Sequence, residues 1–193
     1  MTSRETTEQQ RNQMIIAIDI LLYQKGFNNM SFSDIAEATG LSKGNLYYYF
    51  KTKEDLLQVI IEHRVNAMKL MLNDWQLKFK TPLERLQRYA QIPVNESTNV
   101  IHYGCPMGSL NTELAKSQPE LQKISKQQFD VFKQWLKKQM RLMLPNENSE
   151  HLAMRLLVRT QGIAIMSQTF NDKNLILREV EDTKRWLNHI SKQ

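Results

Sequence analysis

Glycine and proline are scarce in this chain, and that scarcity most constrains its fold. Only six glycines and five prolines occur in 193 residues, which leaves few of the turns and breaks that separate β-strands. Helix starts, by contrast, are frequent. Ser31, Thr52, Thr81 and Ser117 each precede an acidic residue by three positions, which is the spacing of a helix capping box. The sequence therefore predicts an all-α protein.

Apolar residues recur every three or four positions along most of the chain, as expected for helices with one buried face. A long helix is expected after Thr52, with an apolar stripe that reaches Phe79 and a length sufficient to link two regions. A bend or break is expected near Pro93, followed by a loop through Gly104. About nine helices are expected, over residues 8–25, 32–39, 42–49, 53–79, 82–97, 107–116, 119–144, 150–170 and 174–190.

Charge and composition limit the compartment and the partners. The net charge is +6, but residues 1–60 hold six Lys or Arg against seven Asp or Glu, and residues 61–193 hold twenty against thirteen. Net charge alone therefore does not indicate a nucleic-acid partner. One cysteine excludes an internal disulfide framework, and no apolar run reaches membrane-spanning length. Since the polar N-terminus also lacks a signal-peptide pattern, we expect a cytoplasmic protein with no membrane partner.

Residues 32–51 have the pattern of two short helices that cross steeply. Such a crossing requires a small residue at the contact and a turn that can be left-handed, and Ala36 and Gly40 satisfy these requirements. Ser42 can cap the second helix, so that its N-terminus and the acid-free, lysine-containing segment 42–53 face outward. The apolar residues expected to hold the helix pair in place are Ile35, Leu41, Leu46 and Phe50.

A helix exposed in this way can enter the major groove of DNA with its N-terminal residues on base edges. Lys43 can donate to guanine acceptors, Asn45 can make the paired contact that adenine offers, and Gly44 lets the backbone approach the groove floor. The alternative is an ordinary helical hairpin with a solvated lysine face. The expected DNA contacts are Ser31, Ser42, Lys43, Gly44, Asn45, Tyr47, Tyr48 and Lys53.

Residues 32–57, FSDIAEATGLSKGNLYYYFKTKEDLL, strongly resemble the DNA-binding domain of the TetR family of transcriptional repressors. The run SKGNLYYYFKTKEDL is similar almost letter for letter to that family's recognition helix and the start of its fourth helix. One departure is Tyr49, where many members have histidine; we expect this position to pack rather than to read bases. The resemblance supports the same set of DNA contacts.

The resemblance also implies an architecture and a function. Residues 1–52 would form a three-helix, helix-turn-helix DNA-binding domain, and residues 53–193 an antiparallel helical domain for effector binding and dimerisation. The protein would be a homodimeric repressor, released from a palindromic operator in double-stranded DNA by a small-molecule effector. An activator and an architectural DNA-binding protein without an effector are the alternatives.

The last two expected helices are candidates for the dimer interface, because apolar-striped helices at a chain end need something to cover them. The alternative is that these stripes only close the core of the monomer. A two-fold dimer would hold its recognition helices about 34 to 36 Å apart, which matches successive major grooves. The side chains expected near the interface are Ile163, Ile165, Phe170, Leu175, Trp186 and Leu187.

Aromatic residues and methionines, of which the whole chain has ten, make an adaptable effector pocket plausible in residues 53–193. The alternative is that these side chains are plain core. The positive charge of this part favours an anionic or neutral effector, although a solvated surface explains the charge equally well. The expected effector-binding residues are Trp75, Phe79, Tyr103, Cys105, Met107, Phe129, Gln161 and Met166, with Tyr89 and Phe132 as further members.

Cys105 lies in the segment YGCPMGSLNTELA, where a Gly-Cys-Pro turn precedes a short expected helix. Helix-end N–H groups can stabilise a thiolate and make it reactive. The segment resembles the corresponding part of a TetR subset, some members of which sense electrophiles or oxidants through a cysteine. A thiol-based sensor acting through Cys105 is therefore the alternative function, and an inert, small, buried side chain is the competing interpretation.

Catalytic and metal chemistry are not expected. The four histidines are far apart, with no pair at a helical metal-ligand spacing, and no Ser-His-Asp, Walker or dinucleotide motif is present. We therefore expect no catalytic residue, no metal and no cofactor.

Overall fold

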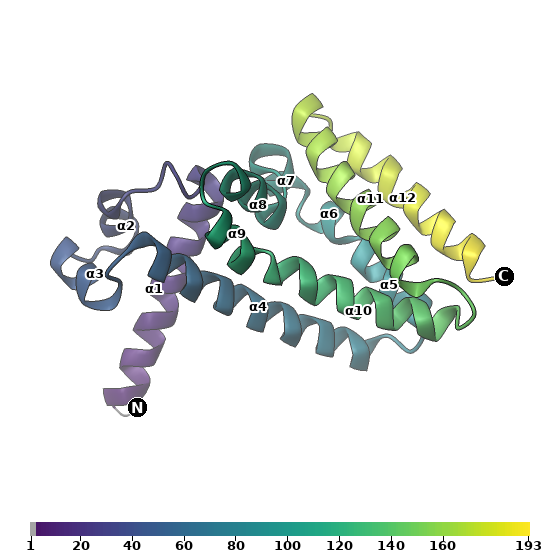
Figure 1. Ribbon diagram of the computed structural model, residues 1–193, viewed down its shortest axis with the longest axis horizontal. Coiled ribbons are helices and arrows are strands. Elements are labelled where there is room, and N and C mark those ends of the chain that lie inside the picture. Colours follow the sequence, from purple (N-terminus) through teal and green to yellow (C-terminus); the bar gives the residue numbers. More distant parts are fainter. Residues whose placement is uncertain (1–2) are drawn as a thin grey trace. The chain divides into compact units, whose positions relative to one another are not determined.

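The computed structural model describes the backbone of residues 3–193 and the side chains from residue 9 onward. Every regular element in these residues is an α-helix, which confirms the all-α prediction (Figure 1). The helices are α1 (Ser3–Lys25), α2 (Phe32–Thr39), α3 (Lys43–Tyr49), α4 (Lys53–Lys78), α5 (Pro82–Ala90), α6 (Ile92–Asn95), α7 (Ser97–Tyr103), α8 (Pro106–Ser117), α9 (Pro119–Ser125), α10 (Gln127–Met143), α11 (Ser149–Phe170) and α12 (Lys173–Ile190). None of the helices in these described residues is long and apolar enough to span a membrane.

The chain divides into two compact units. The first unit consists of Met1–Asn66 and Ser109–Gln127, and the second of Ala67–Gly108 and Gln128–Gln193. Helices α4 and α8 therefore begin in one unit and end in the other, and α10 has its first residue, Gln127, in the first unit and the rest in the second. These compact units differ from the two functional domains expected from the sequence, residues 1–52 and 53–193. The functional division stays a prediction.

Capping explains where several helices begin. The Ser31 hydroxyl accepts the N–H of Asp34, and the Asp34 carboxylate accepts the N–H of Ser31, so α2 begins with the expected capping box. The same reciprocal bonds precede α4 and α5, in the pairs Thr52–Asp55 and Thr81–Glu84. Three of the four caps expected from sequence are thus confirmed.

The fourth expected cap, Ser117, is wrong. Helix α8 continues through Ser117, whose hydroxyl donates to the carbonyl of Glu113 one turn earlier. The next helix begins only at Pro119, and the residue before it, Gln118, makes no side-chain cap bond. A serine three residues before an acid satisfies the capping pattern, but the preceding helix uses that serine as its last residue.

Two expected long helices are divided. The segment 119–144 separates at Lys126 into α9 and α10, and the segment 82–97 separates into α5 and α6, with α7 in place of the expected loop. Pro93 explains why helix resumes: it lies in the first turn of α6, where its missing N–H would have no helical partner. The break itself falls just before it, at Gln91, whose N–H is shared between the carbonyls of Gln87 and Arg88.

Each unit has an apolar core. In the first unit, α1 to α4 and the C-terminal part of α8 bury side chains such as Ile18, Ile35, Leu57 and Leu114, all inaccessible to solvent. The second unit has a larger cluster that includes residues of α4, α5, α10, α11 and α12, and a smaller cluster from α7, α11 and α12. Helices α11 and α12 lie side by side in opposite directions (Figure 1).

Candidate nucleic-acid interface

Helix α3 is exposed along nearly its whole length. Leu46 is its one buried residue, and Tyr48 is 78% exposed. The chain reverses between α2 and α3 at Gly40, whose φ of 70° and ψ of 10° are left-handed and suit glycine. Ile35 and Phe50 are buried as expected, while Leu41 is only half-buried. The geometry is that of a helical pair whose second member faces solvent.

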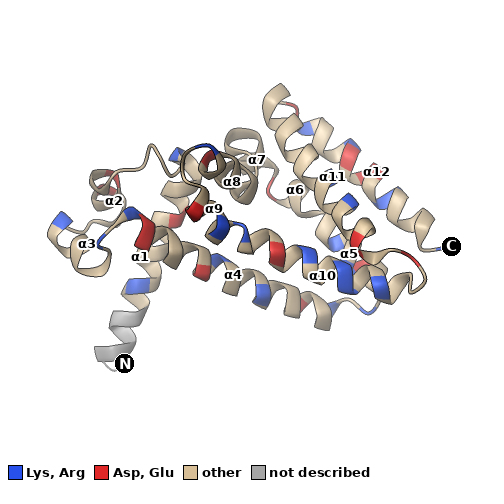
Figure 2. Ribbon diagram, viewed as in Figure 1, with Lys and Arg blue, Asp and Glu red and all other residues tan. Residues whose placement is uncertain are grey.

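The first turn of α3 presents polar groups without acidic neighbours. The Ser42 hydroxyl accepts the N–H of Asn45 at 3.2 Å, so the helix has a proper N-cap. Lys43, Gly44 and Asn45 are all exposed. Figure 2 shows that α3 carries positive but no negative residues. A cation, an amide and a bare backbone segment therefore face solvent together at this helix end.

The three consecutive tyrosines of α3 differ in their surroundings. The ring of Tyr47 stacks on the ring of Phe32, with centroids 4.7 Å apart. Tyr48 and Tyr49 contact each other edge to face at 5.4 Å. The ammonium of Lys51 donates to the carbonyl of Tyr47 at 3.0 Å and so closes the C-terminal end of the helix. Tyr47 is held in place, whereas Tyr48 extends into solvent.

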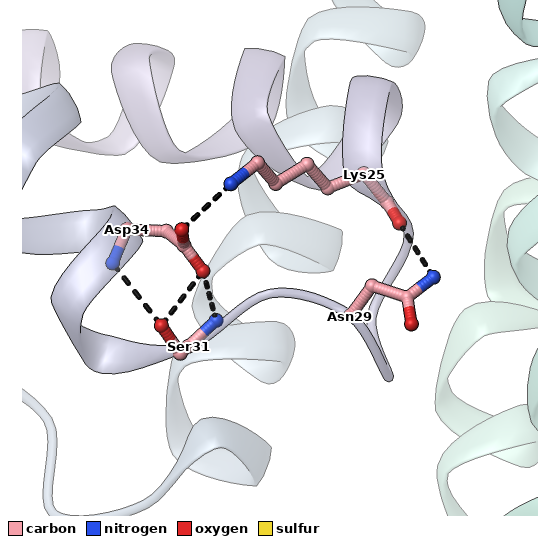
Figure 3. A network of polar contacts seen from close by, with 4 residues as sticks. All are labelled: Lys25, Asn29, Ser31 and Asp34. Atoms are coloured by element: carbon pink, nitrogen blue, oxygen red, sulfur yellow. Dashed lines mark hydrogen bonds and ion pairs between the residues drawn. The ribbon is translucent and has the colours of Figure 1, made fainter.

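A polar network fixes α2 to the end of α1 (Figure 3). Lys25 pairs with Asp34 at 2.6 Å, and the Ser31 hydroxyl donates to the same carboxylate at 2.7 Å. The Asn29 amide donates to the carbonyl of Lys25. The bond from Lys25, reinforced by the bonds from Ser31, holds the pKa of Asp34 well below its usual value. The hydroxyl of Ser31 is thus already engaged within the chain.

Lys53, another expected phosphate contact, also has an internal role. Its Nζ donates to the carbonyl of Phe27 at 2.6 Å and lies 4.6 Å from the centroid of the Phe27 ring. An ammonium carries three N–H groups, so other protons of Lys53 can still reach an external acceptor. The arrangement ties the first residue of α4 to the turn between α1 and α2.

The eight expected effector residues lie in several environments. Trp75 is buried, with its ring edge to face against Trp135 at 5.9 Å and the guanidinium of Arg88 at 5.1 Å. Phe79, Met107 and Phe129 are partly buried against the larger core cluster, and Cys105 against the smaller one. Tyr103 and Gln161 are half-buried, and Met166 is 44% exposed.

A cavity of about 600 Å³ lies between α11 and α12. Met166 is the one expected effector residue in its lining. Sequence reasoning missed its charged members because charges on a striped helix were treated as solvated, although the three-residue spacing of Glu179 and Asp182 indicates a shared face. The lining residues are Arg159, Gly162, Ile163, Met166, Leu175, Glu179, Asp182, Thr183 and Trp186.

Arg159 is the one cationic residue in the lining of this cavity, and Arg155 lies on the same ring of Trp186. The guanidinium groups of Arg155 and Arg159 lie 4.8 and 5.0 Å from the ring of Trp186. Burial, and then the charge of Arg155, lowers the pKa of Arg159 from its ordinary value, while Glu179 opposes the shift. The lining therefore combines the aromatic ring of Trp186, the guanidinium of Arg159 and the carboxylates of Glu179 and Asp182.

The single cysteine, Cys105, lies immediately before α8. The Cys105 sulfur accepts the N–H of Gly108 at 3.4 Å. A Cβ at Gly108 would lie 2.6 Å from Oε1 of Gln161, the end of a flexible side chain, so this side chain of α11 comes close to the first turn of α8. Thr160, the residue before Gln161 in α11, contacts Tyr89 of α5. The two hydroxyl oxygens lie 3.2 Å apart, and burial raises the pKa of Tyr89.

Within the described residues, no group of three His, Cys, Asp or Glu could hold a metal ion.

Comparison with known proteins agrees with this geometry. Residues 17–60 match the family model described as bacterial regulatory proteins, tetR family. Over 170 residues, 86% of this chain and 87% of the relative, the sequence is 25% identical to an uncharacterized HTH-type transcriptional regulator of Lactococcus lactis. A 72-residue match, 33% identical, covers 37% of this chain and 38% of the HTH-type transcriptional regulator QacR of Staphylococcus aureus.

Solved structures extend the similarity to nearly the whole chain. A TetR-family transcriptional regulator from Cytophaga hutchinsonii has a TM-score of 0.82 at 18% identity, and covers 98% of this chain and 96% of its own. The reduced form of Escherichia coli NemR has a TM-score of 0.80 at 17% identity, over 92% and 96% of the two chains. At such identities, the likeness shows a common fold.

Proposed function

We propose, from the premise that this chain belongs to the TetR family of helix-turn-helix transcriptional regulators, that it is a homodimeric repressor which a small molecule releases from a palindromic operator. The chain is a DNA-binding transcriptional regulator and not an enzyme. The observation that carries the proposal is α3, a capped and acid-free helix in which every residue but Leu46 is exposed. Because the family model describes bacterial regulatory proteins and bacterial DNA lies in the cytoplasm, we also propose a cytoplasmic location.

The proposed base contacts are Lys43 and Asn45, with Gly44 allowing close backbone approach. Tyr47 and Tyr48 would contact phosphates or thymine methyl groups. The hydroxyl proton of Ser42 can reach a phosphate, since its oxygen already caps α3 through a lone pair. Of the remaining proposed contacts, Lys53 keeps ammonium protons to offer, whereas Ser31 would have to exchange its bond to Asp34.

Selection of bound duplexes from a random library at fixed salt tests this proposal. The expected product is a palindrome with half-sites about one helical turn, or 34 to 36 Å, apart. Lys43→Ala should reduce the preference for this site by about 1–3 kcal/mol. Lys123→Ala is the matched control, because Lys123 is an exposed lysine of the same unit that pairs only with Glu120 in the described residues. Unchanged selectivity in Lys43→Ala would contradict the placement of the reading helix.

The homodimer is supported by an uncovered apolar face on α11 and α12. Of the six side chains expected there, Ile165 and Phe170 are exposed, and Leu175 and Trp186 line the cavity. Ile163 and Leu187 are instead 5% and 0% exposed, so they contribute mainly to the core of their own protomer. The exposed large apolar residues of these two helices, which we call the apolar face, are Met154, Val158, Ile165, Met166, Phe170 and Leu177.

The effector is proposed to bind in the second unit, among the partly buried side chains around the larger core cluster. Phe79, Met107, Phe129 and Gln161 are the main candidates, with Trp75, Tyr103, Cys105 and Met166 as the others. An effector needs only about 1.4 kcal/mol of preference for the detached state to weaken operator binding tenfold. A small-molecule screen that records operator release and tryptophan fluorescence tests this proposal; a screen without any binder would favour the architectural alternative.

Thiol-based sensing through Cys105 is the second candidate. One observation favours it: the half-buried sulfur accepts an N–H at the start of α8, where a change at sulfur would disturb the helix end. With a quinone, the sulfur would form a new bond to a ring carbon, and the thiol proton would pass to a quinone oxygen. Operator affinity before and after quinone treatment, compared between the parent and Cys105→Ser, tests it. Equal release of both proteins would exclude this candidate.

A further inference from the structure

The turn between α1 and α2 is held by charged side chains from two other helices. The Glu113 carboxylate, from α8, accepts the N–H of Phe27 at 3.0 Å and the N–H of Asn28 at 2.6 Å. The carbonyl of Phe27 accepts from the ammonium of Lys53, in α4, at 2.6 Å. Both polar backbone groups of one buried residue, Phe27, are therefore bound by ionised groups far away in the sequence, which makes these bonds stronger than neutral ones.

The fit around Glu113 is close. Gly26 has a φ of +78°, and a Cβ on it would lie 2.8 Å from Oε2 of Glu113. The end of α8 and the residue after it add two longer contacts: the Asn28 amide donates to Ser117, and the Gln118 amide donates to Asn28, both at 3.4 Å. The last turn of α8 thus contacts this turn through more than one side chain. We refer to the contacts of Glu113 and Lys53 with residues 26–28 as the turn clamp.

The turn clamp is continuous with the reading helix. Three residues after Asn28, the Ser31–Asp34 box begins α2, and Lys25 ties that box back to α1. Phe32, the first residue of α2, then stacks on Tyr47 of α3. Side-chain contacts and the covalent chain of residues 28–31 together therefore connect α8, through the turn and α2, to α3. A displacement of Glu113 has a direct mechanical route to the residues proposed to read DNA.

Both helices that form the turn clamp also extend into the second unit. The boundary between the units falls after Asn66 in α4 and after Gly108 in α8. We propose that Glu113 is a positioning residue which couples the state of α8 to the placement of α3 on DNA. This inference rests on the DNA-binding function described above. It adds the residue through which a ligand-induced shift of α8 would reach the turn and so release the operator.

Linkage gives a test that needs no effector. If α8 and the DNA-binding helices are coupled through Glu113, operator binding must change the state of α8 as much as α8 changes operator binding. Cys105, the single cysteine, lies immediately before α8 and bonds to its first turn through Gly108. Its rate of labelling by an aromatic disulfide reagent therefore reports on the start of α8 with no added probe.

The experiment measures this rate with and without saturating selected duplex. In the parent protein, DNA should change the rate by about fivefold or more, the lower end of usual allosteric coupling. In Glu113→Ala the rate should no longer depend on DNA, and Glu113→Gln, which keeps one acceptor oxygen, should fall between. Because each protein is saturated with duplex, differences in affinity do not enter. Glu120→Ala, which removes an exposed carboxylate of α9, should behave like the parent.

The outcomes separate this inference from the proposed function. A DNA-dependent rate that persists in a folded Glu113→Ala protein overturns the coupling role of Glu113, as does a parent rate that ignores bound DNA. Neither result affects the assignment of α3 to DNA. Failure of the parent to select any duplex would instead contradict the proposed operator binding. Circular dichroism melts show whether each variant is folded. If Glu113→Ala does not fold, the DNA dependence of labelling is compared between the parent and Glu113→Gln instead.

Discussion

The ring of Tyr47 in α3 stacks on the ring of Phe32 in α2, with centroids 4.7 Å apart and planes inclined by 28°. Phe32 is the first residue of α2, and Tyr47 lies in the last turn of α3. The contact therefore closes the end of the helical pair that is remote from the turn at Gly40. With the turn at one end and the stacked rings at the other, α2 and α3 are held as a single body.

Removing this stack should affect stability and DNA binding together. Phe32→Leu keeps an apolar side chain but loses the ring contact, so we expect the free energy of unfolding to fall by about 1 kcal/mol. Operator affinity should fall as well, because α3 loses a support. Urea denaturation and fluorescence anisotropy with labelled duplex measure the two quantities. Tyr48→Leu is the contrasting variant: its exposed ring should matter for DNA and hardly for unfolding. Similar profiles for the two variants would contradict this division.

Two glycines with similar backbone conformations should respond differently to alanine. Gly26 and Gly40 have φ of +78° and +70°, so each substitution should cost about 1 kcal/mol of backbone strain. A Cβ at Gly40 meets open space, whereas one at Gly26 lies 2.8 Å from the Glu113 carboxylate. Gly26→Ala should therefore destabilise the protein more than Gly40→Ala in urea denaturation.

A double variant separates the two costs at Gly26. In a Glu113→Ala background the steric conflict is absent, so the additional effect of Gly26→Ala should shrink toward that of Gly40→Ala. An additional effect as large as in the parent would mean that the backbone alone, and not the turn clamp, makes glycine necessary at this position.

Local patterns in the sequence predicted the helical pair of α2 and α3 well. They could not predict contacts between residues far apart in the sequence. Gly40, Ser42 and Leu46 act through neighbours within a few residues, and their roles follow from capping, turn and spacing rules. Glu113 lies 86 residues from Phe27, and no periodicity or cap signal connects the two. For the same reason, sequence reasoning named Lys53 as a phosphate contact and missed its bond to the Phe27 carbonyl.

The effector region was harder to predict for a different reason. Apolar spacing identifies which face of a helix is buried, but does not distinguish close packing from a cavity. Trp75 is in fact buried in a core cluster, whereas Arg159 and Glu179 line a cavity that the apolar pattern does not indicate. The expected cap at Ser117 was wrong because the hydroxyl of Ser117 bonds within α8 instead of capping the next helix.

Acid should weaken the second unit through Glu150. Hydrogen bonds from Lys137 and then Lys133, at 2.8 and 2.9 Å, lower the pKa of Glu150 from 4.5 to about 2. In the unfolded chain this carboxylate takes up a proton near its ordinary pKa, but in the folded protein it stays ionised. Its stabilising contribution is therefore present above about pH 4.5 and is lost as the pH falls toward 2.

The corresponding variant is Glu150→Gln. Between about pH 5 and pH 3 its melting temperature should fall less than that of the parent, because the ion pair is already absent. The difference should shrink at high salt, since the group is exposed to solvent. Glu147→Gln, at a neighbouring exposed carboxylate without an ion pair in the described residues, serves as control and should follow the parent. Parallel curves for the parent and Glu150→Gln would remove the assigned role of this residue.

The apolar face of α11 and α12 should control assembly. Phe170 and Val158 are 64% and 60% exposed, and an aspartate at either position would place a charge where the proposed dimer excludes water. We expect Phe170→Asp and Val158→Asp to be monomers by size-exclusion chromatography with light scattering. Their operator affinity should fall by about a hundredfold or more, because the two half-sites are no longer bound together.

Leu77→Asp provides the matched control for this assembly. Leu77, in α4, is 86% exposed and belongs to the same unit, but it lies outside α11 and α12. The same change at Leu77 should leave both mass and operator affinity as in the parent, because its charge stays in water. If Phe170→Asp keeps the mass of a parent dimer, then the interface lies on another face. If the parent protein is a monomer that binds a single half-site, the proposed homodimer is contradicted. The proposal that α3 reads DNA would not be affected by that result.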